Sequence, residues 1–303
     1  LRRQNYRDNL VLGTENMPKG MKIVAGEWPS ATTQWPVVFE ADTNAPIAGT
    51  LGDITVNSKK DGKTPVKGGV WQNYDLVRDG NRGTFYKTWA DKIAFVVTDE
   101  LPFKLNVEIP KTPIVRYGTK YIKVTVEKKK GWDEQILVRN LYKPSGIGAS
   151  SYIRIPKGKP SGSYYFSANS RAATGDWKMA FIGEATVGGG RAWSSTELYD
   201  LKVGDYFVSG RIPLVTTVQG KDCKLVVQVT QKTPFEGKAK VTLGSLPSGC
   251  TAEPQYLTKD MKELVFDVKV PANAKIGYDR NVYCDFNLEQ NGETIFQRFA
   301  YSG

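Results

Sequence analysis

The feature that most constrains this chain is a unit that occurs three times. In each copy an aromatic residue is followed twelve positions later by the proline of a Pro-x-Gly turn: Tyr6 and Pro18, Trp132 and Pro144, Phe235 and Pro247. A fixed internal spacing that recurs along a chain is typical of a duplicated structural unit. The sequence therefore predicts three copies of one fold.

Each copy continues with the same strand and turn signals. Apolar residues alternate after the aromatic residue, at Leu10 and Leu12, Ile136 and Val138, and Ala239 and Val241. An apolar run with Phe39, Phe166 or Phe266 follows, then Gly49, Gly175 or Gly277, and then a hairpin signal at Asp61-Gly62, 188–190 or Asn291-Gly292. Alternation with period two predicts strands with one buried face, and Asn-Gly or Asp-Gly predicts hairpin turns.

Two further strands are predicted upstream of the second and third copies. They lie at 103–108 and 121–127 in one copy, and at 206–210 and 224–231 in the other. The first copy has no room for them before Tyr6, and Leu1 is not a natural start. We expect these strands to lie outside the given chain: a longer protein was cleaved, its start was not observed, or another subunit donates them.

This pattern predicts an all-β chain of three tandem immunoglobulin-like β-sandwich repeats, because such sandwiches have about seven short strands per ~100 residues. The expected boundaries are 1–101, 102–203 and 204–303, and the first repeat lacks its N-terminal strands. That repeat also carries an insertion at about 63–95. We expect its run Phe85 to Trp89 to form a loop that packs between repeats, with a short helix as the alternative. No apolar stretch approaches the ~20 residues of a membrane span.

Several phrases resemble tandem immunoglobulin-like repeats near the C-terminus of large bacterial secreted or envelope proteins, which often also carry pre-peptidase C-terminal-type domains. These phrases lie at 102–105, 141–146, 234–239, 246–249 and 258–266. The resemblance covers nearly the whole chain. It implies an extracellular scaffold that is secreted, periplasmic or at the cell surface, and it carries no catalytic residue.

The residue types also restrict the chemistry. The chain has no histidine, so neither a Ser-His-Asp triad nor a histidine-containing zinc site can form within it. Neighbouring carboxylates such as Asp99 and Glu100 point to opposite faces of a strand, which makes them poor glycosidase pairs. We predict a protein that is not an enzyme and holds no cofactor or metal.

The charge balance allows two interpretations. The chain has 42 Lys and Arg against 31 Asp and Glu, a formal net charge of +11. An anionic polysaccharide or envelope partner would suit this charge, but so would an ordinary lysine-rich surface. The basic residues are scattered apart from the run at Lys128, Lys129 and Lys130, and no nucleic-acid-binding signature is present.

The three cysteines lie in the last third of the chain, at Cys223, Cys250 and Cys284. No metal-binding spacing occurs among them. Alternation predicts that Cys223 and Cys284 point into the core. A disulfide from Cys284 to either Cys223 or Cys250 is one interpretation, and we expect the strand of Cys250 to neighbour that of Cys284. Three reduced thiols are the other interpretation.

The aromatic residues offer candidate surfaces. Tyr6, Trp132 and Phe235 are expected to fill the core at a strand end, with a ligand platform as the alternative. Trp28, Trp35, Trp71 and Trp89 all fall in the first repeat, where exposure would suit sugar or protein contacts and burial would suit a junction between repeats. The candidate interaction surface comprises Trp71, Tyr74, Tyr86 and Trp89.

Two functions remain as hypotheses. The first is a structural or assembly segment of spacer, surface-layer, fibre or adhesin type, which pairs strands with the rest of its parent chain or with neighbouring subunits. The second is a carbohydrate- or protein-binding module attached to a secreted enzyme. A hydrolase within these residues would need a cleft with converging carboxylates.

Overall fold

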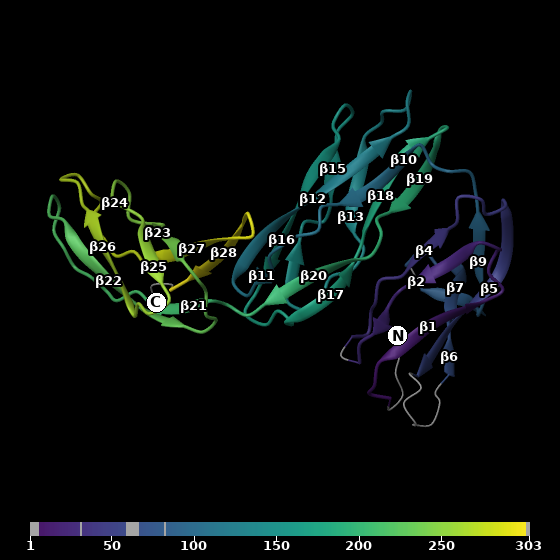
Figure 1. Cartoon of the computed structure of the whole chain (residues 1–303), viewed down its shortest axis with the longest axis horizontal. Coiled ribbons are helices and arrows are strands. Elements are labelled where there is room, and N and C mark those ends of the chain that lie inside the picture. Colours follow the sequence, from purple (N-terminus) through teal and green to yellow (C-terminus); the bar gives the residue numbers. More distant parts are fainter. Residues whose placement is uncertain (1–5, 31, 59–66, 82, 301–303) are drawn as a thin grey trace.

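The structure is a computed structural model that describes residues 6–30, 32–58, 67–81 and 83–300. Within these ranges every regular element is a strand, and nearly all strand pairs are antiparallel. Three bodies follow one another along the chain (Figure 1): an N-terminal segment (6–101), a middle segment (102–203) and a C-terminal segment (204–300). The all-β class predicted from the sequence is therefore confirmed.

The middle segment packs in the manner of a β-sandwich. Its strands are β10 (Phe103–Val107), β11 (Ile114–Val115), β12 (Gly118–Lys128), β13 (Ile136–Asn140), β14 (Ile147–Ala149), β15 (Ile153–Ile155), β16 (Ser161–Ala168), β17 (Gly175–Met179), β18 (Phe181–Val187), β19 (Gly190–Ser195) and β20 (Tyr199–Gly204). One sheet has β10, β12, β16 and β14, a second has the order β15-β13-β18-β19, and a third the order β11-β20-β17. Val124, Ile136, Phe166 and Phe181 are fully buried in the common core.

The C-terminal segment repeats this plan. Its strands are β21 (Val208–Arg211), β22 (Cys223–Gln231), β23 (Lys238–Gly244), β24 (Thr251–Ala252), β25 (Gln255–Thr258), β26 (Glu263–Lys269), β27 (Tyr283–Gln290) and β28 (Glu293–Phe299). One sheet has the order β21-β22-β26-β24, and β25, β23, β27 and β28 form the other. Val227, Val241, Phe266 and Phe286 fill the core between them.

The N-terminal segment is built differently. Its strands are β1 (Leu10–Glu15), β2 (Met21–Val24), β3 (Glu27–Trp28), β4 (Val38–Ala41), β5 (Ala48–Ser58), β6 (Lys67–Gly69), β7 (Gln72–Arg78), β8 (Thr84–Ala90) and β9 (Ile93–Val97). β3, β1, β5 and β6 form a sheet that β9 joins beside β5, while β2-β4 and β7-β8 are separate pairs. The buried cluster of this segment consists of Leu10, Trp28 and Val56 among the described residues.

The predicted strands and turns are found where the repeat pattern placed them. Phe235 is buried, Trp132 packs against the middle core, and Tyr6 packs against the N-terminal cluster, so the core role of these aromatics is confirmed. The hairpin turn at Asn291-Gly292 has positive φ at both residues, 54° and 77°, as the favoured two-residue hairpin turn requires. The signal at Asp61-Gly62 lies outside the described residues.

The strand that carries the phenylalanine of each copy's apolar run has different neighbours in the three segments. β16, with Phe166, pairs with β12, and β26, with Phe266, pairs with β22. β4, with Phe39, pairs with β2 only, as far as the described residues extend. The described part of the chain therefore leaves one edge of β4 open, at the place where β12 and β22 lie in the other two segments.

The insertion in the N-terminal segment differs from its prediction. The run Phe85 to Trp89 forms β8 instead of a loop or a helix, and it pairs with β7 in an antiparallel hairpin. Threonine and aromatic residues favour strands, and Asp79 supports the turn, because its carboxylate accepts hydrogen bonds from the backbone of Asn81 and Gly83. The hairpin is exposed and does not pack between segments.

Candidate functional site

The densest set of cross-segment contacts lies where the middle and C-terminal segments meet. β12 pairs with β28 in the register Gly118↔Gln297 and Thr119↔Phe296, so the two segments share one continuous sheet (Figure 1). A Cβ atom built on Gly118 would lie 2.3 Å from the backbone oxygen of Phe296. Glycine at this position therefore permits the two backbones to approach closely enough to pair.

β11 joins the two hydrophobic cores. Ile114 is buried in the core of the middle segment, and its neighbour Val115 is buried in the core of the C-terminal segment. Successive residues of a strand point to opposite faces, so two adjacent residues anchor the same backbone to two bodies. Each side chain is 1% exposed, which means that both cores close around this strand.

A carboxylate of the C-terminal segment binds a loop and a strand of the middle segment. Glu293 accepts hydrogen bonds from the backbone N–H groups of Lys111 at 2.9 Å and Thr112 at 3.1 Å, and from the Thr112 hydroxyl at 2.7 Å. The buried Lys120 ammonium donates to it at 2.8 Å. Burial alone would raise the pKa of Glu293, but these donors outweigh it and bring the pKa to about 2.

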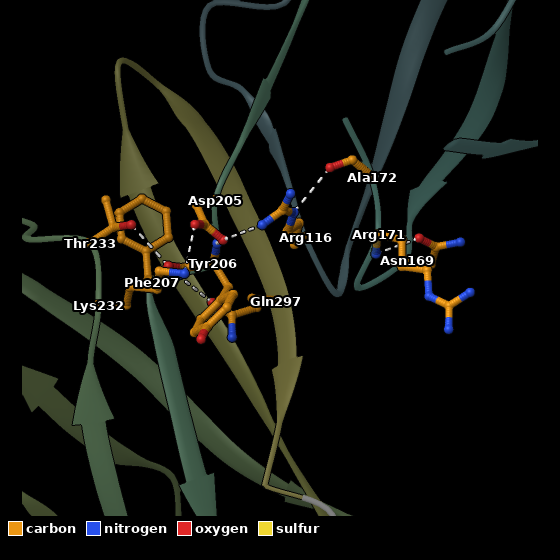
Figure 2. Close-up of polar contacts among 10 residues, drawn as sticks. All are labelled: Arg116, Asn169, Arg171, Ala172, Asp205, Tyr206, Phe207, Lys232, Thr233 and Gln297. Carbon is orange, nitrogen blue, oxygen red and sulfur yellow. Dashed lines mark hydrogen bonds and ion pairs between the residues drawn. The ribbon is translucent and has the colours of Figure 1, made fainter. Parts of the chain in front are cut away.

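A second carboxylate, Asp205, occupies the connection between the two segments (Figure 2). It forms ion pairs with Arg116 at 3.3 Å and Lys232 at 2.9 Å, and it accepts the backbone N–H of Tyr206 at 2.9 Å. Burial opposes ionisation here, yet Lys232, Tyr206 and Arg116 together lower the pKa of Asp205. Arg116 also donates to the Ala172 backbone oxygen at 3.0 Å, so this carboxylate links elements from both sides of the junction.

Gln297 lies on the C-terminal side of the junction, where its side chain contacts the start of β21 (Figure 2). Its side chain is fully buried. Its oxygen accepts hydrogen bonds from the backbone of Phe207 at 2.7 Å and Val208 at 3.2 Å, and its amide donates to the Val208 oxygen at 2.5 Å. A buried amide that satisfies both of its polar ends fixes the start of β21 against β28.

All four residues of the predicted interaction surface lie on or beside the β7–β8 hairpin, but its register places Trp71 and Trp89 on one face and Tyr74 and Tyr86 on the other. Trp71 and Tyr86 are 72% and 70% exposed, and Trp89 and Tyr74 are 56% and 48% exposed. The rings of Trp71 and Trp89 lie 5.2 Å apart. Phe85, at 71% exposure, extends the same hairpin. Solvent exposure of so many aromatic side chains is unusual and is typical of surfaces that bind a partner.

The other two tryptophans of this segment are structural. Trp28 is buried, and its indole donates to the backbone oxygen of Thr32 at 3.1 Å. Trp35 lies between segments: its ring is 6.0 Å from that of Tyr142, and its indole donates to the Ala25 oxygen at 2.5 Å. Burial at a junction, which was one interpretation of this group, is therefore confirmed for Trp35 and wrong for Trp71 and Trp89.

The three cysteines are free thiols in this structure. Cys284 is fully buried, as predicted, and burial raises the pKa of its thiol to about 12. Burial, followed by the nearby Cys250, also raises the pKa of Cys223. The expectation that the strand of Cys250 neighbours that of Cys284 is wrong: β24, which follows Cys250, pairs with β26, whereas β27 pairs with β23 and β28.

The lysine run at the end of β12 is mostly neutralised within the chain. Lys128 pairs with Asp133, and Lys129 pairs with Glu100 at 2.7 Å. This arrangement favours an ordinary solvated surface at this run over a site for an anionic partner.

The described ranges contain neither a metal-binding group of side chains nor a membrane-spanning helix. No group of three or more Cys, Asp or Glu side chains could hold a metal ion there, and no helix there is long and apolar enough to cross a membrane. Two of the carboxylates with a lowered pKa, Glu293 and Asp205, are engaged in the junction. The absence of catalysis stays a prediction.

Comparisons with known proteins add little. No protein-family model matches the chain, and no curated protein matches it. Among solved structures, a protein of unknown function from Porphyromonas gingivalis W83 is 14% identical, with a TM-score of 0.25, and the match covers 66% of this chain and 99% of that chain. A likeness at this level supports no functional argument.

The sequence did not reveal the junction residues. Asp205, Gln297 and Glu293 are ordinary polar residues in or beside predicted strands, and their partners lie up to 182 positions away. One signal was available in principle: Gln297 occupies an inward-facing position between Ile295 and Phe299. A buried polar residue in an apolar alternation needs a partner, and here the partner is the backbone of β21.

Proposed function

We propose that this chain is a non-catalytic structural and assembly segment of an extracellular or cell-surface bacterial protein, of spacer, surface-layer, fibre or adhesin type. It consists of three tandem immunoglobulin-like β-sandwich repeats, and the first lacks its N-terminal strands. The protein is secreted, periplasmic or displayed on the cell surface.

One observation carries this proposal: the middle and C-terminal segments are joined as a single body. Domains joined only by a flexible linker reorient freely, whereas a shared sheet and a strand buried in both cores fix their relative orientation. Here β12–β28 pairing, the two-core strand β11 and the Glu293 contacts all cross the junction. A fixed direction between successive repeats is what a spacer requires.

The open edge of β4 supports the assembly part of the proposal. Exposed strand edges accept further strands through backbone hydrogen bonds. The thin cluster of Leu10, Trp28 and Val56 would gain apolar contacts if a strand pair covered it. We propose that other parts of the parent chain or a neighbouring subunit supply this pair.

Small-angle X-ray scattering of the whole chain tests the spacer role. We expect one fixed arrangement of the middle and C-terminal segments to fit the wild-type profile. Glu293→Gln should loosen the junction, so that several arrangements of the two segments are needed to fit its profile. Glu184→Gln is a matched control, because Glu184 pairs with Arg139 and Arg191 inside the middle segment. A wild-type profile that requires freely reoriented segments would contradict the proposal.

The proposed cellular location of the protein is tested separately, by fractionating the bacterium that produces it. We expect an antibody against this chain to detect it in the culture medium, the periplasm or on intact cells. Detection only in the cytoplasm would remove the basis for a surface role.

The exposed hairpin supports a second candidate function, an accessory module that binds carbohydrate or protein. Flat aromatic side chains stack on sugar rings and anchor protein contacts. We expect the double variant Trp71→Ala, Trp89→Ala to lose retention on an insoluble polysaccharide or a partner protein that the wild type binds. Trp193→Ala is the control, because this tryptophan is 53% exposed on β19, outside the hairpin.

A further inference from the structure

The β7–β8 hairpin receives little support from the rest of the chain. All described residues of 73–89 are exposed, and within the described residues β7 and β8 pair only with each other. A two-stranded hairpin by itself is marginally stable in water, whereas three or more strands form a stable sheet. A neighbouring strand would therefore stabilise this hairpin.

The edge of β8 that faces away from β7 is suited to accept such a strand. Residues 86–90 of β8 follow one another without a bulge, and the extra residue in this part of the hairpin, Leu76, lies on β7. Alternate backbone N–H and C=O groups of 86–90 point away from β7. Threonine and aromatic residues favour strands, and 84–90 contains no proline. Of the usual features that block an edge strand, this stretch has only the charge of Lys87.

Strand alternation divides the side chains of this edge between two faces. Lys87 and Trp89 lie on one face of the hairpin, and Thr88 lies on the other. Asp75 is directly opposite Lys87 in the register, but its carboxylate is held by Arg78, and Lys87 forms no ion pair within the described residues. The ammonium of Lys87 and the exposed ring of Trp89 can therefore both contact a partner.

The edge is complementary to itself. When two copies of β8 pair antiparallel about a two-fold axis at Thr88, Lys87 faces the partner's Trp89 and Tyr86 faces the partner's Ala90. Directly opposite residues bring their Cβ atoms to about 4.5–5.5 Å, so each Lys87 ammonium reaches a Trp89 ring for a cation–π contact. A two-fold axis at Lys87 would instead place two like charges opposite each other, which is unfavourable. Lys87 therefore selects the axis at Thr88.

We propose that the outer edge of β8 binds the same edge of a second copy of this chain, so that two hairpins form one four-stranded sheet across a two-fold axis at Thr88. Backbone hydrogen bonds along 86–90 and two Lys87–Trp89 contacts between the copies hold the sheet together. Two-fold dimers, in which the same surface of both copies forms the contact, are the commonest oligomers. This inference does not depend on the spacer role proposed above, which concerns a different junction.

Analytical ultracentrifugation of the whole chain is the first test. We expect a concentration-dependent equilibrium between monomer and dimer, and slower amide hydrogen exchange in 86–90 as the dimer forms. A chain that stays monomeric at about 1 mM would overturn the proposal and leave this edge to a different kind of partner. A dimer that protects another region and not 86–90 would also overturn it.

A charge exchange on the two-fold axis locates the contact. Thr88→Asp and Thr88→Lys should each weaken the dimer about fivefold or more, because two like charges then lie opposite each other. A mixture of the two variants should form a mixed dimer, which also shows that both variants fold. A role of Thr88 in folding alone would give no such rescue. Absence of the mixed dimer would overturn the pairing about Thr88.

Val77→Asp is the matched control. Val77 is 49% exposed on the same hairpin, but it lies on β7 and not on the paired edge, so this variant should leave the affinity unchanged. Lys87→Gln should weaken the dimer severalfold, because both cation–π contacts are lost, and an unchanged affinity would contradict the register. Equal weakening by Val77→Asp and Thr88→Asp would mean that the copies meet through the faces of the hairpin, and would overturn pairing through β8.

Discussion

The N-terminal and middle segments carry the same repeat pattern but bury very different amounts of apolar surface. In the middle segment, strands β10 and β12 bring Phe103, Leu105 and Val124 into a core that also encloses Phe166. In the N-terminal segment, where the described residues supply no such pair, Phe39 is only half-buried against Phe95. The comparison teaches that the first two strands of each unit close the core, while the repeated turns and aromatics can form without them.

The largest expected effect tests this difference directly. Phe166→Ala and Phe266→Ala should each destabilise their own segment by about 3–5 kcal/mol, since both side chains are fully buried. Phe39→Ala at the matching position should cost about 1 kcal/mol, because less apolar area leaves water. Amide hydrogen exchange in urea measures each segment separately. Equal costs at the three positions would show that the N-terminal core is closed after all.

The next largest effect is expected at the junction of the middle and C-terminal segments, which share a sheet. Within the described residues, the N-terminal segment shares no sheet with the middle segment. Gly118→Ala would place a methyl group 2.3 Å from the Phe296 oxygen, so β12 and β28 must separate, at a cost of about 1–3 kcal/mol. Faster exchange of the backbone amides near Thr119 and Phe296 should report the separation. Gly190→Ala is the control, since its nearest contact would be 3.7 Å. Unchanged exchange in Gly118→Ala would mean that the junction does not depend on this pairing.

Acid should weaken the same junction. The pKa of Glu293 is about 2, below its ordinary 4.5, so the folded state favours the ionised carboxylate. The stabilisation is complete above about pH 4.5 and is lost as the pH falls toward 2. Glu293→Gln should cost about 1–2 kcal/mol at pH 7 and remove most of this pH dependence, which hydrogen exchange of 111–120 measures. A wild-type junction whose exchange is unaffected between pH 5 and 2.5 would contradict this account.

The smallest effect should come from the exposed hairpin. Trp71→Ala with Trp89→Ala should change the stability of the N-terminal segment by less than about 0.5 kcal/mol, because both side chains lie in solvent. Thermal unfolding followed by circular dichroism measures this. A loss above about 2 kcal/mol would show that the tryptophans support the fold rather than form a surface for a partner.

Local patterns were sufficient to predict many of the strands and turns in the middle and C-terminal segments. Alternation located β13 and β23, and Asn291-Gly292 identified the hairpin between β27 and β28. Alternation also predicted the burial of Cys284. These features depend on neighbours within a few residues, which a single sequence displays.

Features that depend on distant parts of the chain could not be predicted in this way. The contact between Thr112 and Glu293 joins residues 181 positions apart, and no periodicity encodes it. The position of Cys250 was assigned to the wrong sheet because the turn after Pro247 leads the chain to β26 and not to β27. The hairpin of the insertion was missed because its two exposed faces remove the alternation by which a strand is recognised.

The brevity of the β12–β28 pairing has a mechanical consequence. Its two residue pairs, Gly118↔Gln297 and Thr119↔Phe296, lie outside the long ladders that hold each core together. When the chain is stretched, we expect these pairs and the Glu293 contacts to part before either sandwich unravels. The chain would then lengthen as the two segments rotate about β11, which stays anchored in both cores, and the same contacts would re-form when the tension ends. In the spacer proposed above, such a junction would act as a reversible elastic element that does not require either segment to refold.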